Sequence, residues 1–136
     1  MRKPFYGLLL LLPLLSCKKT IEHIQEQKIL DVMVDGQWIV TKFTLNGTDQ
    51  TPSFSSYRFQ YYRDMTVDAI HNGTVETTGQ WSGDISTRST WAFFTGAAPP
   101  VSYLNGTWQI TNNTLNYVIL TQADAGNNKF MRLDKL

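Results

Sequence analysis

Few side chains in this sequence are of the types that perform catalysis or hold a metal ion. The 136 residues include one cysteine, Cys17, and two histidines, His23 and His71. A lone Cys excludes an intramolecular disulfide and a cysteine-rich zinc site, and neither a second His nor a Cys accompanies His71. A nucleophilic Ser or Thr would also need a base beside it, which two widely separated His residues do not supply. We therefore expect no enzymatic activity, no metal and no cofactor.

The charge and the apolar content indicate one folded domain without affinity for nucleic acid. Basic and acidic residues are nearly balanced, 12 against 11, and 42% of the residues are apolar. That apolar fraction is too high for a disordered chain, and 136 residues leave room for a single core. Because no strongly basic face is available to neutralise phosphates, nucleic acid is not expected as a partner.

The first residues have the pattern of an export signal. Arg2 and Lys3 precede an apolar run over residues 5–15, which is too short to cross a membrane as a helix and has the length of a secretory signal. The run ends in Leu14-Leu15-Ser16-Cys17, which resembles the lipobox of bacterial lipoproteins. The resemblance implies cleavage of residues 1–16 and acylation of Cys17. The alternative is a plain secretory signal that contains a Cys by chance.

Acylation of Cys17 would explain why an exported protein keeps a single Cys. A free thiol in an oxidising compartment is liable to pair between molecules, and acylation removes that liability. It also anchors the protein, since more than one acyl chain gives stable membrane attachment. In the lipoproteins that this chain resembles, an Asp beside the Cys is associated with inner-membrane retention and an acidic cluster with surface export, but here Lys18 and Lys19 follow. The expected location is the outer membrane, on its periplasmic side.

A short helix is expected between the anchor and the folded domain. Apolar residues recur along one side of residues 20–33, Thr20 can cap the first turn, and Asp35-Gly36 supplies a stop. The polar side mixes Glu, Gln and Lys, which favours packing over the open end of a barrel instead of lying on the membrane. Residues 17–35 are accordingly assigned to the lipidated N-terminus, a linker and this helix.

The rest of the chain, residues 36–136, reads as short strands separated by turns. In residues 57–61 and 75–82, the side chains at every second position are mostly apolar and those between them are polar. This alternation predicts a sheet with one face in water. The eight expected strands cover residues 37–46, 57–61, 66–71, 75–82, 90–95, 107–111, 115–121 and 130–136. No connection is long enough for a crossover helix, so the expected fold is all-β: an eight-stranded antiparallel up-and-down barrel or a strongly curved sandwich.

The expected turns differ in how well their residues suit a left-handed backbone. Asn72-Gly73 fits a two-residue hairpin that needs positive φ, and Asn112-Asn113 is predicted to form a similar turn because Asn tolerates that region. Asp64-Met65 is a poorer candidate, since Met has no such tolerance.

Three Gly-x-Trp motifs give the domain a family resemblance. Gly36-Gln37-Trp38 opens the first strand, and Gly79-Gln80-Trp81 and Gly106-Thr107-Trp108 repeat the pattern. The first motif is similar in position to the G-x-W of the lipocalin superfamily, and the chain resembles the small lipocalin-like lipoproteins of bacterial outer membranes. The resemblance implies a barrel in which these Gly and Trp residues are structural, Trp38 fills the closed end, and Arg132 or Lys135 from the last strand stacks on it.

Trp91 and Phe93 are the candidate ligand-binding residues. Both lie on one expected strand beside the Gly- and Pro-containing segment 96–100. If both point inward near a mouth closed by that segment, they line a pocket for an apolar molecule. Ordinary burial in the core is the alternative for both side chains.

Two functions remain open. In the first, which the lipocalin resemblance implies, a lipid-anchored barrel in the cell envelope binds a small apolar ligand. In the second, a barrel filled by side chains contacts an envelope protein through exposed aromatic residues such as Tyr61, Tyr62 and Tyr103. An eight-stranded barrel is large enough for either, so a contiguous interior void of about 300 Å³ or more would favour binding.

Overall fold

The fold comes from a computed structural model that describes residues 27–124 and 126–136. Residues 27–34 form a helix. The strands are β1 (Trp38–Leu45), β2 (Thr48–Asp49), β3 (Tyr57–Tyr61), β4 (Thr66–His71), β5 (Thr74–Asp84), β6 (Ser89–Phe93), β7 (Gly106–Asn113), β8 (Tyr117–Asp124) and β9 (Asn127–Lys135). Two 3₁₀ helices, η1 (Thr51–Phe54) and η2 (Val101–Leu104), interrupt them. The expected signal, the helix cap Thr20, Cys17 and His23 lie outside the described residues.

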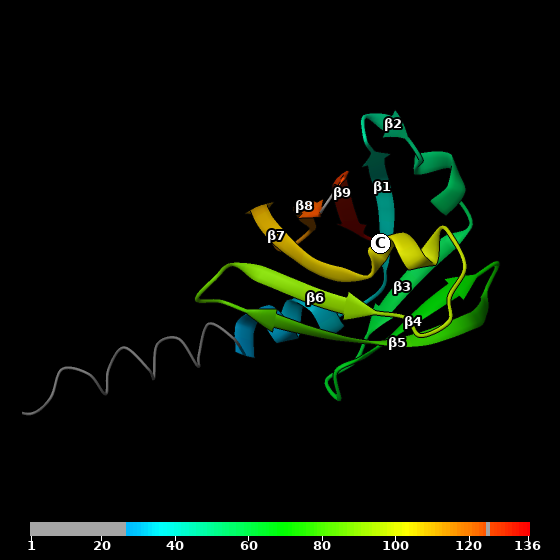
Figure 1. The fold of residues 1–136 in the computed structure, drawn as a ribbon. Coiled ribbons are helices and arrows are strands. Elements are labelled where there is room, and N and C mark those ends of the chain that lie inside the picture. Colours follow the sequence, from blue (N-terminus) through cyan, green and yellow to red (C-terminus); the bar gives the residue numbers. More distant parts are fainter. Residues whose placement is uncertain (1–26, 125) are drawn as a thin grey trace, which may run out of the picture.

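The strands form one antiparallel sheet that closes on itself. Of its nine strands, β2 pairs only with the end of β1, and β1 pairs with β9 to join the remaining eight into a barrel (Figure 1). The expected all-β fold, an eight-stranded antiparallel barrel preceded by a short helix, is confirmed, and each expected strand overlaps an observed one. Because the sheet closes within residues 38–135, every strand pairing of the barrel is kept in a chain that lacks the first 17 residues.

Two of the expected turns have different outcomes. Asn72-Gly73 has φ angles of 50° and 79°, as a two-residue hairpin with positive φ requires. The turn expected at Asn112-Asn113 is wrong, because both residues belong to β7 and the ladder with β8 continues through them. The chain reverses at residues 114–116 instead, where the Thr114 hydroxyl accepts hydrogen bonds from the amides of Asn116 and Tyr117 at 3.1 and 3.2 Å.

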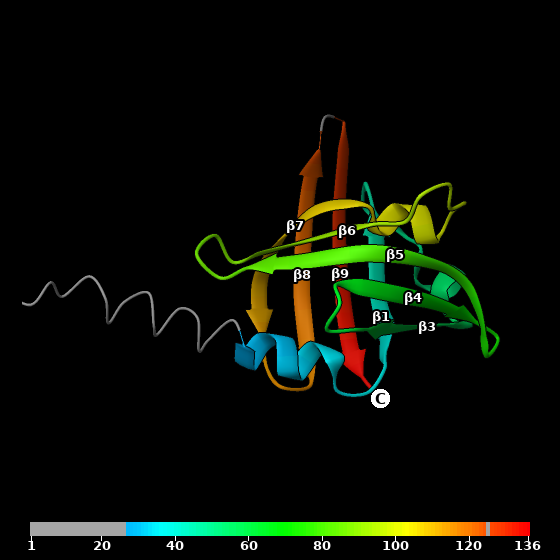
Figure 2. The same ribbon diagram turned by 90° about the horizontal axis from the view of Figure 1, so that it is seen from below.

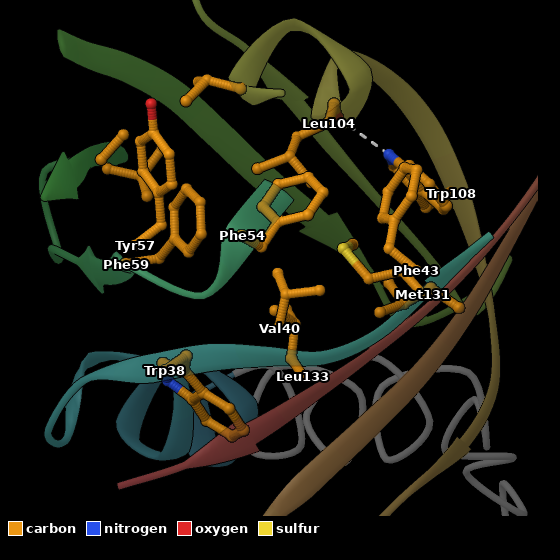
Figure 3. Close-up of a cluster of buried hydrophobic side chains, with 14 of the residues drawn as sticks. Trp38, Val40, Phe43, Phe54, Tyr57, Phe59, Leu104, Trp108, Met131 and Leu133 are labelled. Atoms are coloured by element: carbon orange, nitrogen blue, oxygen red, sulfur yellow. Dashed lines mark hydrogen bonds between the residues drawn. The ribbon is translucent and has the colours of Figure 1, made fainter. Parts of the chain in front are cut away.

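The two ends of the barrel are covered by different elements. In an up-and-down sheet alternate turns lie at the same end, so η1, η2 and the β4–β5 turn share one end with aromatic side chains packed beneath them. Phe43 and Phe54 have ring centroids 5.0 Å apart in this cluster, and Figure 3 shows Tyr57 and Phe59 on the other side of Phe54. The helix 27–34 lies across the other end (Figure 2), together with the β3–β4, β5–β6 and β7–β8 turns.

The helix packs on the barrel through apolar side chains, as its sequence predicts. Leu30, Val32, Met33 and Val34 are partly buried against the core. The helix stops before Gly36, whose φ of 77° lets the chain turn into β1. No helix among residues 27–124 and 126–136 is long and apolar enough to cross a bilayer.

Candidate functional site

A cavity with a volume of about 1090 Å³ occupies the helix end of the barrel. Its deep wall consists of almost fully buried apolar side chains: Trp81, Phe94, Leu104, Trp108, Leu120 and Met131. Side chains that keep accessible surface, such as Ile29, Met65 and Ile110, surround the opening. The volume is comparable to that of small-molecule sites, which measure about 300–1000 Å³.

The alternation of side chains along β8 and β9 determines which residues form the deep wall of the cavity. On β8 and β9 every second residue points inward, so Val118, Leu120, Met131 and Leu133 are buried while the residues between them are not. The pairing Leu120↔Met131 sets these two side chains next to each other in the cavity wall.

The helix 27–34 forms the outer wall of the cavity and is tied to the barrel by polar contacts. Ile29, Leu30, Val32 and Met33 line the cavity. The indole nitrogen of Trp38 donates a hydrogen bond of 3.0 Å to the Met33 carbonyl, and Arg63 in the β3–β4 turn pairs with Asp31. The opening therefore lies beside the helix, at the end that Trp38 was expected to close.

Trp91 and Phe93 do not point inward, as their assignment to a ligand site would require. Their side chains are 36% and 44% exposed and stack on the outer face, with ring centroids 6.4 Å apart. Ala92 is the cross-strand partner of Trp81, which points inward, and partners on adjacent strands share a face. Ala92 therefore lines the cavity, as does Phe94, while Trp91 and Phe93 on either side of Ala92 face outward.

The segment 96–100 also lies away from the cavity mouth. It belongs to the end of the barrel that carries η2, and its residues line a separate and smaller pocket of about 320 Å³ with Tyr57, Glu76 and Thr77. The cavity opening is therefore not covered by this segment.

The three Gly-x-Trp tryptophans have the same local environment. Trp38, Trp81 and Trp108 are each at most 4% exposed, and each indole nitrogen donates to a backbone carbonyl. The acceptors are the carbonyls of Met33, Tyr62 and Leu104, at 3.0, 3.1 and 2.8 Å. These bonds satisfy the one polar group that a buried indole brings with it, and each fixes the chain at an end of the barrel.

The glycines of the second and third motifs permit close packing. A Cβ at Gly79 would lie 2.6 Å from the Phe93 carbonyl oxygen and 2.7 Å from the Phe94 ring. A Cβ at Gly106, where φ is 109°, would lie 2.7 Å from the side-chain nitrogen of Gln122. Gly79 therefore needs glycine because a backbone atom blocks a Cβ, and Gly106 because its positive φ disfavours a side chain.

Of the two basic residues expected over Trp38, Lys135 occupies that position. Its ammonium nitrogen lies 5.2 Å from the centroid of the Trp38 ring. Arg132 instead lies over Tyr117, at 4.3 Å, and pairs with Asp134.

The interior of the cavity carries no charge at neutral pH. The phenol of Tyr61 lines it, and burial raises the pKa of that group well above its ordinary value, so the phenol stays protonated. Charged lining residues are confined to the rim, where Lys28, Asp84 and Arg88 are exposed. Hydrogen bonds from Ser86 lower the pKa of Asp84, which is therefore ionised. The described residues contain no group of three His, Cys, Asp or Glu that could hold a metal ion.

Several cavity residues could not be found from the sequence. Leu104 lies on η2, a connection that no periodic sequence pattern predicts. Met65 and Arg88 lie in turns. On β8 the run Tyr117–Leu120 is apolar throughout, so alternation alone does not tell which side chains point inward. The register with β9 decides it.

Comparison with known proteins supports the fold. The chain matches no known family model, and no curated protein matches it. The structure is similar to the crystal structure of a DUF4847 family protein from Bacteroides vulgatus, with 16% sequence identity and a TM-score of 0.55 over 78% of this chain and 96% of that chain. At this identity the likeness shows a shared barrel fold and assigns no ligand.

Proposed function

We propose that this protein binds a small apolar ligand inside its barrel while a lipid on Cys17 holds it at the outer membrane, on the periplasmic side. The observation that supports ligand binding is the cavity of about 1090 Å³, well above the void that a filled barrel would leave. Transfer of a ligand from water into an apolar interior is favourable by about 0.8 kcal/mol for each buried CH₂. The proposal includes no chemical reaction, since the interior offers neither a nucleophile with a base nor a charged group.

The position of the cavity relative to the anchor supports a ligand that comes from the membrane. Gln27 and Lys28 line the opening, and Cys17 precedes Gln27 by a span that reaches at most about 35 Å when fully extended. A lipid on Cys17 would therefore keep the opening close to the bilayer surface, where apolar molecules accumulate. The ligand would not need to cross a long path through water.

Filling the cavity with a side chain tests the proposal. The chain from Lys18 to Leu136 retains every described element, and its binding of the neutral dye N-phenyl-1-naphthylamine can be followed by fluorescence. Ala92→Trp places a large side chain in the cavity, whereas Phe93→Trp changes the neighbouring outward position. We expect Ala92→Trp to weaken dye binding at least about tenfold, with far-UV circular dichroism unchanged, and Phe93→Trp to have no effect. Equal binding by all three proteins would refute an interior site.

The second candidate function, contact with an envelope protein, is favoured by the exposed pair Trp91 and Phe93. Stacked aromatic rings on the outward face of a barrel strand are typical of interaction surfaces. Of the tyrosines expected on such a surface, Tyr61 lines the cavity and Tyr103 stacks on Phe43, which leaves Tyr62 exposed.

This second function has its own test. Trp91→Ser combined with Phe93→Ser would abolish a complex detected by cross-linking in membranes, while dye binding by the cavity would stay unchanged. If every cross-link survives both substitutions, this surface does not carry the contact.

A further inference from the structure

Two residues at the cavity rim have a backbone conformation that their side chains disfavour. Among the described residues, the non-glycine positions with positive φ are Asn46, Asn72, Met65 and Arg88. The two Asn residues precede glycines in turns and belong to a type that tolerates this region. Met65, with φ of 68°, and Arg88, with φ of 51°, do not, and both line the cavity. Disfavoured backbone conformations of this kind concentrate at functional sites.

The backbone of Arg88 is held firmly in this conformation. Its amide donates to the Ile85 carbonyl at 3.2 Å. Its carbonyl accepts from the Ile110 amide at 2.8 Å and from the Gln109 side chain at 2.9 Å. The β5–β6 turn is therefore tied to β7, and these bonds hold an arginine at the mouth of an apolar cavity.

The rim of the cavity carries unpaired positive charge. Neither Arg88 nor Lys28, the two cationic residues of the lining, lies within 4.0 Å of a carboxylate in the described part of the chain. The lining also includes Asp84, which is ionised and whose carboxylate accepts hydrogen bonds from the Ser86 amide at 2.9 Å and the Ser86 hydroxyl at 2.7 Å. Among the described residues the rim therefore carries two cations, neither in an ion pair, against one anion, and its net charge favours an anionic group at the opening.

We propose that the ligand is an amphiphile with one alkyl chain and an anionic head group, and that Arg88 and Lys28 bind this head group at the rim. This inference rests on the proposed function. The interior accepts the alkyl chain because its walls are apolar, and it rejects the head group because nothing in it would stabilise a charge. Arg88 presents several N–H donors suited to a carboxylate or a phosphate. Met65 offers an unbranched, adaptable side chain beside the alkyl chain where it enters.

Displacement of N-phenyl-1-naphthylamine from the chain 18–136 tests the head-group preference. The competitors are palmitate, hexadecyl phosphate and 1-hexadecanol, each used below its aggregation concentration. We expect both anions to displace the dye at about tenfold lower concentration than the alcohol at low salt, and this advantage to shrink as salt is raised. Comparison of palmitate with hexadecyl phosphate shows whether a fatty acid or a phosphate-bearing lipid is the better ligand.

Substitutions at the rim assign the preference to named residues. Arg88→Asn removes the charge and suits the left-handed backbone, so it should bind anions about threefold to tenfold more weakly and yet unfold at the same or a higher urea concentration. Lys28→Gln should likewise weaken the binding of palmitate and hexadecyl phosphate. Arg58→Gln, on the exposed face of β3 and outside the cavity lining, is the control and should change nothing.

The outcomes distinguish this inference from the proposed function. If the dye and the alcohol bind but the anions have no advantage, or if Arg88→Asn binds palmitate and hexadecyl phosphate as tightly as the parent chain, the head-group site is refuted while the apolar cavity stands. If neither the dye nor any competitor binds, both proposals fail.

Discussion

Lys135 lies over the ring of Trp38, its direct cross-strand partner, with 5.2 Å between the ammonium nitrogen and the ring centroid. Trp38 is fully buried and the Lys135 side chain is 15% exposed, so the contact is largely shielded from water. The last strand thereby covers the first Trp of the barrel at the point where the sheet closes.

This contact predicts a measurable loss of stability in Lys135→Gln. A partly desolvated cation–π contact contributes about 0.5–2 kcal/mol, and the free energy of unfolding in urea should fall by that amount. Lys135 also pairs with Asp35 at 3.6 Å, but Asp35 is 84% exposed, so Asp35→Asn should change stability by less than about 0.5 kcal/mol. Equal losses in both variants would assign the effect to the ion pair instead of the ring.

Gly79→Ala should destabilise the barrel by at least about 1–3 kcal/mol. The new Cβ would lie 2.6 Å from the Phe93 carbonyl oxygen, a backbone atom that cannot move without disturbing the ladder. Gly83→Ala on the same strand is the matched control, because its Cβ would approach nothing closer than 3.9 Å. Urea denaturation should separate the two variants clearly. A stable Gly79→Ala protein would show that β5 and β6 do not pack as closely as described.

The carboxylate of Asp134 should make stability depend on pH. Hydrogen bonds from Arg132 at 2.9 and 3.0 Å, with a further one from Thr41, lower the pKa of this group below its ordinary value. Its contribution is therefore present above the unfolded pKa of about 3.9 and is lost as pH falls through the folded value. The stability difference between the parent chain and Asp134→Asn should shrink between about pH 5 and pH 2. A difference that stays constant over this range would contradict the assignment.

The lipid anchor is tested by Cys17→Ala in cells that express the full chain. We expect this variant to leave the membrane fraction, and the parent protein to carry a mass increment of fatty-acyl groups on a chain that begins at residue 17. Lys18→Ala keeps the Cys and should remain in the membrane fraction. Persistence of Cys17→Ala in membranes would refute anchoring through this residue.

The positions of several strands could be predicted because their local sequence signals agree. Residues 57–61 and 66–71 are bounded by turn residues, and the observed β3 and β4 have these bounds. The inward face of β6 could not be predicted, since Trp91, Phe93 and Phe94 place bulky side chains on both faces of the strand. Only the pairing of Ala92 with Trp81 decides which face is buried.

The location of the cavity opening depends on packing between distant segments. Phe54 on η1 and Leu104 on η2 fill the barrel from one end, and neither 3₁₀ segment has a periodic pattern from which that role could be read. The left-handed backbone at Arg88 likewise has no local signal, because it is imposed by hydrogen bonds from β7. The site therefore could not be predicted from any single stretch of the sequence.

Native mass spectrometry of the chain 18–136, after incubation with a bacterial lipid extract and removal of excess lipid, tests the central claim most directly. We predict a complex with one bound molecule whose mass is lost on organic extraction, and no such complex with Ala92→Trp, in which the cavity is filled. The bare mass of the parent chain after the same incubation, or an identical complex with Ala92→Trp, would contradict ligand binding inside the barrel.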